Sequence, residues 1–372
     1  MKKFFAGLLF ICLFAGVSSA DVVYNTSTGN LGVIEVSSIP DVSIPVTTYT
    51  NAGNDSILAS FANGDYARIL LIKRETDTSA ISGDSALIFN TSDMTTPIDE
   101  YYLDGSYGAF NVGYSRNGNS VFVASVLDNT ISEFDSGNFK YLNHYTLTDP
   151  DYLIRDLIVD NDYIYLLINA SLSQSFLIRF DGQLKENVKT YTSFDIPFMA
   201  DCVASLGNNK IVIGYEKGVA RLDNRTFITL VSTDEEVIAV GRDHNTGNDG
   251  FYYITQIESN GNYTSSLWHY DSTIYVMLES ETSSESACQL VYDKDKNVMA
   301  ALMGGKIFVY ESKTDTLLGE FDSADLDGVP LSITMSTVIK SSSKKNSSGC
   351  NFTGAGVVLM LIAALKFRRS KS

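Results

Sequence analysis

Chemically reactive side chains are scarce in this chain, which has only 3 His, 4 Cys, 1 Trp and 6 Pro in 372 residues. We expect His144, His244 and His269 to lie in three different structural repeats, and each stands beside a predicted turn or strand end. We interpret them as surface residues and expect no Ser-His-Asp triad and no His-rich metal centre. The GxSxG elbow, the HExxH motif and the P-loop are also absent. We therefore predict no catalytic residues.

Basic residues are scarce over most of the chain. There are 27 Lys and Arg against 44 Asp and Glu, and 8 of the basic residues lie in residues 1–20 and 344–372, which contain no acid. Residues 21–343 thus keep 19 basic and 44 acidic residues, a net charge of −25. Nucleic-acid binding depends on Lys and Arg that neutralise phosphates. We expect no nucleic-acid partner and no loose adhesion to anionic lipid.

The N-terminal segment 1–20 has the three regions of a secretory signal peptide. Lys2 and Lys3 precede an apolar stretch over residues 4–17, and Ser-Ser-Ala follows at 18–20. A permanent membrane helix needs about 20 apolar residues, more than this stretch offers. We expect cleavage before Asp21 and export of the remaining chain.

Helical periodicity is missing from the body of the chain, where short β-prone runs alternate with turns of Asn, Asp and Gly. Some runs, such as 164–168, are apolar at every position, which predicts strands buried on both faces. An apolar residue closing a strand, usually followed by an acid, recurs every ~46 residues, a spacing typical of propellers and other repeats. These landmarks are Val36, Phe89, Phe134, Phe180, Leu222, Tyr270 and Tyr310.

Each repeat is predicted to contain four strands, as in 200–206, 210–216, 218–223 and 226–232. Seven such units predict an all-β, seven-bladed β-propeller over residues 21–340. A solenoid has a similar repeat length. The ends favour a ring, because three N-terminal strands and one C-terminal strand at 329–336 together complete one blade and remove the open edges.

The repeats at 129–147 and 306–322 resemble the YVTN-type, WD-like repeats of bacterial extracytoplasmic propellers. The resemblance implies the fold far more than an activity. A single Trp268 argues against the Trp-docking motif of quinoprotein propellers and the Asp-box of sialidases. Cys202 and Cys288 fall in innermost strands with one whole blade between them, beyond the about 7 Å Cα limit of a disulfide, so we expect free thiols.

The C-terminus combines a Ser/Lys-rich spacer with a Gly-Cys motif (341–351) and a short hydrophobic segment with a basic tail (352–372). Residues 352–367 would span about 24 Å as a helix, less than a hydrocarbon core of about 30 Å. The arrangement resembles the Synerg-CTERM sorting signal. The resemblance implies cleavage by a rhombosortase-type envelope protease near Gly349 and Cys350, modification of Cys350, membrane contact before processing, and surface display. A permanent tail anchor in the periplasm is the alternative.

Two acidic loops are candidates for Ca²⁺ binding. Residues 243–250 provide half of a calcium loop without the bidentate Glu, and turns favour the same residues. Asp322, Asp325 and Asp327 lie on a longer loop between blades and are the better candidates for a metal site. We favour plain loops at both places, and Ca²⁺ is the only cofactor that the sequence suggests.

Topology predicts that the two faces of the propeller differ. The first-second and third-fourth turns share one face, which gathers acids at Asp135, Asp181, Asp223 and Asp271. The other face carries the second-third and inter-blade loops with the aromatic residues Tyr107, Tyr152 and Phe198. We predict that this face contacts a ligand or partner. Alternatively, these rings only fill the seams between blades.

The sequence therefore favours an exported propeller, in the bacterial periplasm or on the outer surface, that binds an unknown extracellular or periplasmic ligand or protein. An extracytoplasmic hydrolase, lactonase-like or glycan-active, is the alternative and requires carboxylates around the central channel. A tail-anchored assembly scaffold in the periplasm is the third possibility.

Overall fold

The structure is a computed structural model that describes residues 20–36, 42–50, 52, 56–63, 66–74, 83–91, 93–103, 106, 108–115, 119–125, 127, 129–147, 149, 152–160, 163–171, 174–181, 191–208, 210–245, 250–293 and 297–336. The chain divides into two compact units, residues 1–339 and 340–372. The second unit lies outside the described residues, as do residues 1–19 of the predicted signal peptide 1–20 and the predicted sorting motif at Gly349 and Cys350.

The described residues form seven four-stranded antiparallel sheets. In order from the centre outward, the sheets are β28 (Pro330–Met335), β1 (Ala20–Thr26), β2 (Leu31–Val36) and β3 (Val46–Tyr49); β4 (Ser56–Asn63), β5 (Tyr66–Lys73), β6 (Ser85–Asn90) and β7 (Asp99–Tyr102); β8 (Ala109–Tyr114), β9 (Ser120–Ser125), β10 (Thr130–Asp135) and β11 (Tyr141–Thr146); β12 (Leu153–Asp160), β13 (Tyr163–Ser171), β14 (Gln174–Asp181) and β15 (Tyr191–Ile196); β16 (Ala200–Ser205), β17 (Ile211–Tyr215), β18 (Gly218–Asp223) and β19 (Thr226–Ser232); β20 (Glu236–Arg242), β21 (Phe251–Ser259), β22 (Asn262–Tyr270) and β23 (Tyr275–Ser283); and β24 (Gln289–Asp293), β25 (Val298–Met303), β26 (Lys306–Glu311) and β27 (Thr316–Phe321).

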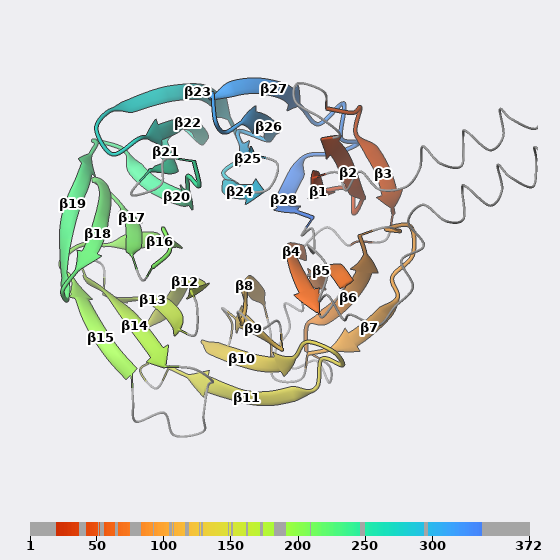
Figure 1. Cartoon of the computed structure of the whole chain (residues 1–372), viewed down its shortest axis with the longest axis horizontal. Coiled ribbons are helices and arrows are strands. Elements are labelled where there is room, and N and C mark those ends of the chain that lie inside the picture. Colours follow the sequence, from red (N-terminus) through yellow and green to blue (C-terminus); the bar gives the residue numbers. More distant parts are fainter. Residues whose placement is uncertain are drawn as a thin grey trace, which may run out of the picture. The chain divides into compact units, whose positions relative to one another are not determined.

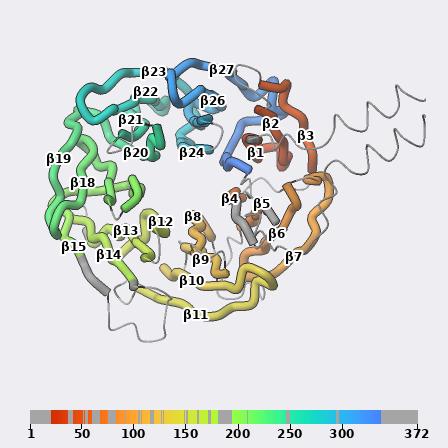
Figure 2. Tube along the Cα trace, in the orientation of Figure 1, coloured from red at the N-terminus to blue at the C-terminus, as the bar shows by residue number. Residues whose placement is uncertain are grey.

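The sheets are the blades of a seven-bladed β-propeller, as the sequence predicts (Figure 1). The innermost strands β28, β4, β8, β12, β16, β20 and β24 contact one another in a ring. Figure 2 shows the C-terminal strand β28 in the same blade as the N-terminal strands β1–β3, where β28 pairs antiparallel with β1. This shared blade closes the ring and covers the edges that an open array would expose. None of the described residues forms a helix long and apolar enough to span a membrane.

The repeat landmarks all fall in equivalent places. Val36, Phe89, Phe134, Phe180, Leu222, Tyr270 and Tyr310 each lie in the third strand of their blade, at or near its end. The prediction that residues 164–168 form a strand buried on both faces is confirmed as well. In β13, Ile164 and Leu166 pack toward the preceding blade while Tyr165 and Leu167 pack toward the following blade, and all four are at most 2% exposed. Successive side chains on opposite faces explain why the run is apolar at every position.

The core consists of seven buried clusters, one at each seam between neighbouring blades, within the described part of the chain. Burial of one large apolar side chain in such a seam contributes about 1.5–3 kcal/mol. The seams hold the blades around the centre without disulfides. Cys202 and Cys288 are both free thiols, as expected.

Five of the seven innermost strands contain a β-bulge at their second or third residue. The ladder registers leave one extra residue on each bulged strand, and these are Phe110, Arg155, Asp201, Ile238 and Leu331. A bulge bends its strand and changes where a side chain points. The extra residues therefore line the central channel and do not follow the alternation of side chains along the paired part of the strand.

The innermost strands are also joined to one another by side chains that bond to backbone groups of the next blade. Ser332 Oγ accepts from the N–H of Leu58 at 3.1 Å, and Gln289 Oε1 accepts from the N–H of Ile333 at 2.9 Å. Asp156 Oδ2 accepts from the N–H of Val203 at 2.7 Å. These bonds satisfy backbone donors that the innermost edge would otherwise leave unpaired.

Candidate functional site at the channel mouth

The central channel contains a cavity of about 800 Å³, lined by residues from all seven innermost strands. All five extra residues of the bulges contribute to its lining. Three of them, Phe110, Ile238 and Leu331, are apolar, whereas Arg155 and Asp201 are charged. The cavity is within the size range of small-molecule sites. Of its four charged lining residues, Arg155, Asp156 and Asp201 lie on two neighbouring blades, and Arg74 lies on the blade β4–β7.

Arg155, Asp201 and Glu236 form a charged cluster at one mouth of this channel. They lie at the starts of β12, β16 and β20. In a four-stranded meander the innermost strand starts on the face that carries the inter-blade loops, so the cluster lies on the face that the sequence predicts to contact a ligand. We call these three residues the mouth cluster.

Within the mouth cluster, Arg155 is held by contacts with two residues, Asp201 and Asn169. Arg155 Nη2 forms an ion pair with Asp201 Oδ1, and the side chain of Asp201 is only 10% exposed. Asn169, which is buried, accepts a hydrogen bond from Arg155 Nε at 3.2 Å when its amide donates to Ser175 Oγ. The guanidinium is therefore fixed on two sides, while 43% of the Arg155 side chain stays accessible. An anchored but accessible Arg can donate further hydrogen bonds to a ligand.

Glu236 and Asp201 form a carboxyl pair. Loss of hydration, a hydrogen bond with Asp201 and the negative charge of Asp201 raise the pKa of Glu236 to about 7, against the opposing effect of Arg155. A hydrogen bond between two carboxyl groups requires a proton on one of them. Glu236 can thus take up or release a proton near neutral pH, which is a property that general acid-base catalysis requires.

Asp156, the next residue after the bulge, also lines the cavity, but its carboxylate is bonded to donors of the protein. Its carboxylate accepts from the N–H of Val203 at 2.7 Å, from the N–H of Leu157 at 2.8 Å and from the side chain of Asn111. Burial raises the pKa of Asp156 to about 7 although these hydrogen bonds oppose the rise. Since its oxygens are occupied by protein donors on three blades, Asp156 positions the strands that carry the mouth cluster.

The aromatic residues predicted for the ligand face have partners in the protein. Tyr152 and Phe198 are partly buried: Tyr152 lies against Phe176 with ring centroids 6.1 Å apart, and Phe198 stacks on Tyr215 at 3.9 Å. Both pack against the clusters at blade seams. Tyr107 lies outside the described residues. The structure thus gives Tyr152 and Phe198 the seam-filling contacts that were the alternative to ligand contact.

In the acidic loop between β27 and β28, each carboxylate accepts a hydrogen bond from the protein. Asp322 Oδ1 accepts from the N–H of Ala324 at 2.7 Å, Asp325 Oδ2 accepts from the N–H of Asp322 at 3.2 Å, and Asp327 Oδ2 accepts from Asn30 Nδ2 at 2.8 Å. Across the residues that the structure describes, no group of three or more His, Cys, Asp or Glu is placed to hold a metal ion. The carboxylates act here as caps for the loop.

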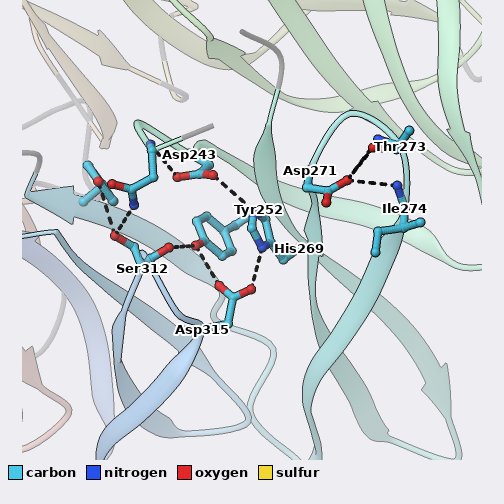
Figure 3. Close-up of polar contacts among 10 residues, drawn as sticks. Asp243, Tyr252, His269, Asp271, Thr273, Ile274, Ser312 and Asp315 are labelled. Atoms are coloured by element: carbon cyan, nitrogen blue, oxygen red, sulfur yellow. Dashed lines mark hydrogen bonds and ion pairs between the residues drawn. The ribbon is translucent and has the colours of Figure 1, made fainter. Parts of the chain in front are cut away.

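His269 differs from the surface residue that the sequence suggested, and that interpretation is wrong. The placement of the three histidines in three different repeats is also wrong, because His244 and His269 belong to the same blade β20–β23. The side chain of His269 is 11% exposed and lies between two carboxylates, with Nδ1 2.7 Å from Asp315 and Nε2 3.2 Å from Asp243 (Figure 3). Tyr252 stacks on the ring at 4.3 Å and donates to Asp315 at 2.9 Å. Burial lowers the pKa of His269, but the hydrogen bonds and charges of both carboxylates outweigh burial and raise it to about 9.

The sequence does not predict the mouth cluster, because its members are 46 and 35 residues apart and match no motif. One signal could have revealed it. When the repeats are aligned with one another, the residue at the bulge is apolar in three blades and charged only at Arg155 and Asp201. A charge where equivalent strands carry an apolar residue indicates a local function rather than packing.

Comparisons with known proteins concern the fold. No protein-family profile matches this chain, and no curated protein matches it. Among solved structures, it is similar to a proposed 6-phosphogluconolactonase from Bacteroides fragilis NCTC 9343, with a TM-score of 0.61 and 10% identity over 86% of this chain and 98% of that one. A proposed 6-phosphogluconolactonase from Bacteroides uniformis ATCC 8492 is similar with a TM-score of 0.59 and 10% identity, over 86% of this chain and 100% of that one. A periplasmic gluconolactonase of Pseudomonas aeruginosa is similar with a TM-score of 0.56 and 12% identity, over 87% of this chain and 100% of that one. This chain shares the seven-bladed propeller architecture with these proteins.

Proposed function

We propose that this protein is an exported binding module that takes a small hydroxyl-bearing molecule at the inter-blade-loop mouth of its channel. The observation that carries the proposal is the cavity of about 800 Å³ with Arg155 and Asp201 at neighbouring bulges of its rim. A guanidinium donates to hydroxyl oxygens, and a carboxylate accepts from hydroxyl groups. The apolar side chains of Phe110 and Ile238 offer contact to the carbon skeleton of such a ligand.

Binding can be tested by thermal-shift screening of the purified propeller against neutral sugars, polyols and lactones, followed by calorimetric titration. We expect Asp201→Asn to weaken binding of any hit at least tenfold, because the variant loses the charged acceptor and disturbs Arg155. Asp223→Asn is the matched control, since Asp223 ends β18 of the same blade on the opposite face. Equal loss in both variants, or no hit in the panel, would contradict the proposal.

A second candidate is hydrolysis of a lactone ring at the same mouth. The carboxyl pair of Asp201 and Glu236 favours it, because one carboxyl can act as a base near neutral pH. The gluconolactonase named among the structural neighbours is consistent with this chemistry. Hydrolysis of glucono-δ-lactone, followed with a pH indicator, should then rise with pH through about 7 and fall by at least a factor of about 10² in Glu236→Gln. A rate equal to that of buffer alone would exclude the hydrolase.

We infer export from the N-terminal segment, and the periplasmic location in the name of one structural neighbour is consistent with it. Surface display is inferred from the C-terminal segment alone. Intact mass of the protein recovered from the cell envelope tests this part. A chain ending at Gly349 or at a modified Cys350 supports sorting to the surface. A chain ending at Ser372 supports a periplasmic tail anchor and the scaffold function instead.

A further inference from the structure

The outer edge of the blade β20–β23 carries a run of four exposed apolar residues. Ile274, Tyr275, Val276 and Met277 are 59%, 58%, 48% and 51% exposed. Elsewhere in the described ranges no more than two adjacent large apolar residues are exposed. Single exposed apolar residues are normal on a protein surface, but a contiguous run marks an interaction site or an aggregation hazard.

The geometry of β23 leaves both its faces and one edge accessible along this run. β23 is the outermost strand of its sheet, on the rim of the ring in Figure 1, and the described residues pair it with β22 alone. Successive side chains of a strand point to opposite faces, so four consecutive exposed residues mean that neither neighbouring blade covers β23 there. The outer edge thus presents backbone N–H and C=O groups between exposed apolar side chains.

The run is also held in place at its start. Asp271 Oδ1 accepts from the N–H groups of Thr273 and Ile274, each at 3.0 Å, and this turn leads directly into β23 (Figure 3). The N–H bonds from Ile274 and Thr273 lower the pKa of Asp271, because they stabilise the charged form of its carboxylate. A preformed strand loses less conformational entropy when another chain pairs with it.

Charge indicates which kind of chain fits this edge. Residues 271–283 contain Asp271, Glu279 and Glu281 but neither Lys, Arg nor Pro, the residues by which edge strands usually discourage pairing. Glu281 forms an ion pair with Lys306 at 3.0 Å, while no ion pair of Asp271 or Glu279 is found among the described residues. A second copy of this chain, with a net charge of −17, would place acid against acid.

We propose that β23 is a docking edge for an extended segment of a partner protein, apolar at its centre and basic at its ends, which adds a fifth strand to this blade. Backbone hydrogen bonds would supply affinity, and the apolar side chains on both faces would select the partner. This interaction is separate from ligand binding at the channel mouth, because β23 is at the opposite edge of the sheet from the innermost strand β20.

Selection from a random dodecapeptide phage library on the whole propeller tests the proposal. The discriminating variant is Val276→Lys combined with Met277→Lys, which places a charge on each face of the run. The matched control is Ile228→Lys in β19, the outermost strand of the neighbouring blade, where Ile228 is 45% exposed. Circular dichroism and thermal melting of both variants verify that the blades remain folded.

We expect the enriched peptides to be apolar with Lys or Arg at the ends, and their affinity, measured by fluorescence anisotropy, to fall at least tenfold in the double variant but not in the control. Three results would overturn the proposal. These are no enriched peptide, enriched peptides that bind the double variant as well as the parent, and a wild-type dimer in sedimentation velocity that the double variant abolishes. The last result would assign the edge to a second copy.

Discussion

His269 joins two blades through a single imidazolium. Asp243 and His269 belong to the blade β20–β23, whereas Asp315 lies in the hairpin between β26 and β27 of the next blade. Burial of the ring disfavours the charged imidazolium of His269. The two carboxylates at hydrogen-bonding distance stabilise the imidazolium by more than burial destabilises it. At this seam a salt bridge therefore adds to apolar packing.

Stability should consequently decline at alkaline pH. The folded-state pKa of about 9 exceeds the unfolded value of 6.5, so the stabilisation is fully present below pH 6.5 and is lost as pH rises through 9. After allowance for partial solvent screening, the effect is about 2 kcal/mol. Urea unfolding at pH 6 and pH 10 should show this loss in the parent and a smaller one in His269→Gln. His144→Gln, an exposed histidine of β11, should behave like the parent; an equal pH effect in all three proteins would contradict the assignment.

The contacts of His269 show what the sequence could not predict at this scale. Asp315 is 46 residues away and in another blade, and only the ring geometry brings the two side chains together. Local sequence around His269 resembles any strand end. The residues that fill the seams were easier to predict, because Phe134 and Phe180 recur at a fixed position of the repeat.

At the scale of elements, the innermost strands combine bulges with bonds between blades. The bulge directs Arg155 and Asp201 into the channel, and the residue after it, such as Asp156 or Ser332, bonds to the next blade. The strands themselves were predictable from their apolar pattern. The bulges were not, because one extra residue in a strand leaves no local sequence pattern and is defined only by the pairing register.

Removal of one inter-blade bond should weaken the fold measurably. Ser332→Ala eliminates the acceptor of the Leu58 N–H and the donor to Asn25 Oδ1 at 2.6 Å, and all three residues are buried. We expect a loss of about 1–3 kcal/mol in the free energy of unfolding, because two buried polar groups lose a partner. Ser323→Ala on the exposed loop is the control and should change little. Equal midpoints for the two variants in denaturant would show that Ser332 does not stabilise the seam.

At the scale of the whole molecule, ring closure depends on β28. The strand pairs with β1, contacts β24 and β4, and is followed by reciprocal bonds between Ser336 and the backbone of Asp21 at 2.9 and 3.0 Å. The complementary ends of the chain made this closure predictable. Loss of β28 would expose the edge of β1 and the apolar seams on either side.

Truncation tests this dependence. A chain ending after residue 336 keeps β28 and should unfold cooperatively with a strand-type circular dichroism spectrum. A chain ending after residue 329 lacks β28 and should aggregate or exchange strands, as seen by size-exclusion chromatography. A monomeric and equally stable shorter chain would contradict the role of β28 in closure.

The central claim is that the mouth cluster binds the ligand. The most direct test is a crystal structure of the propeller soaked with the compound that gives the largest thermal shift. We predict density for that compound in contact with Arg155 and Asp201 at the inter-blade-loop mouth. Density only at the opposite mouth beside Asp243, or only in the blade seams with the channel unoccupied, would contradict the claim.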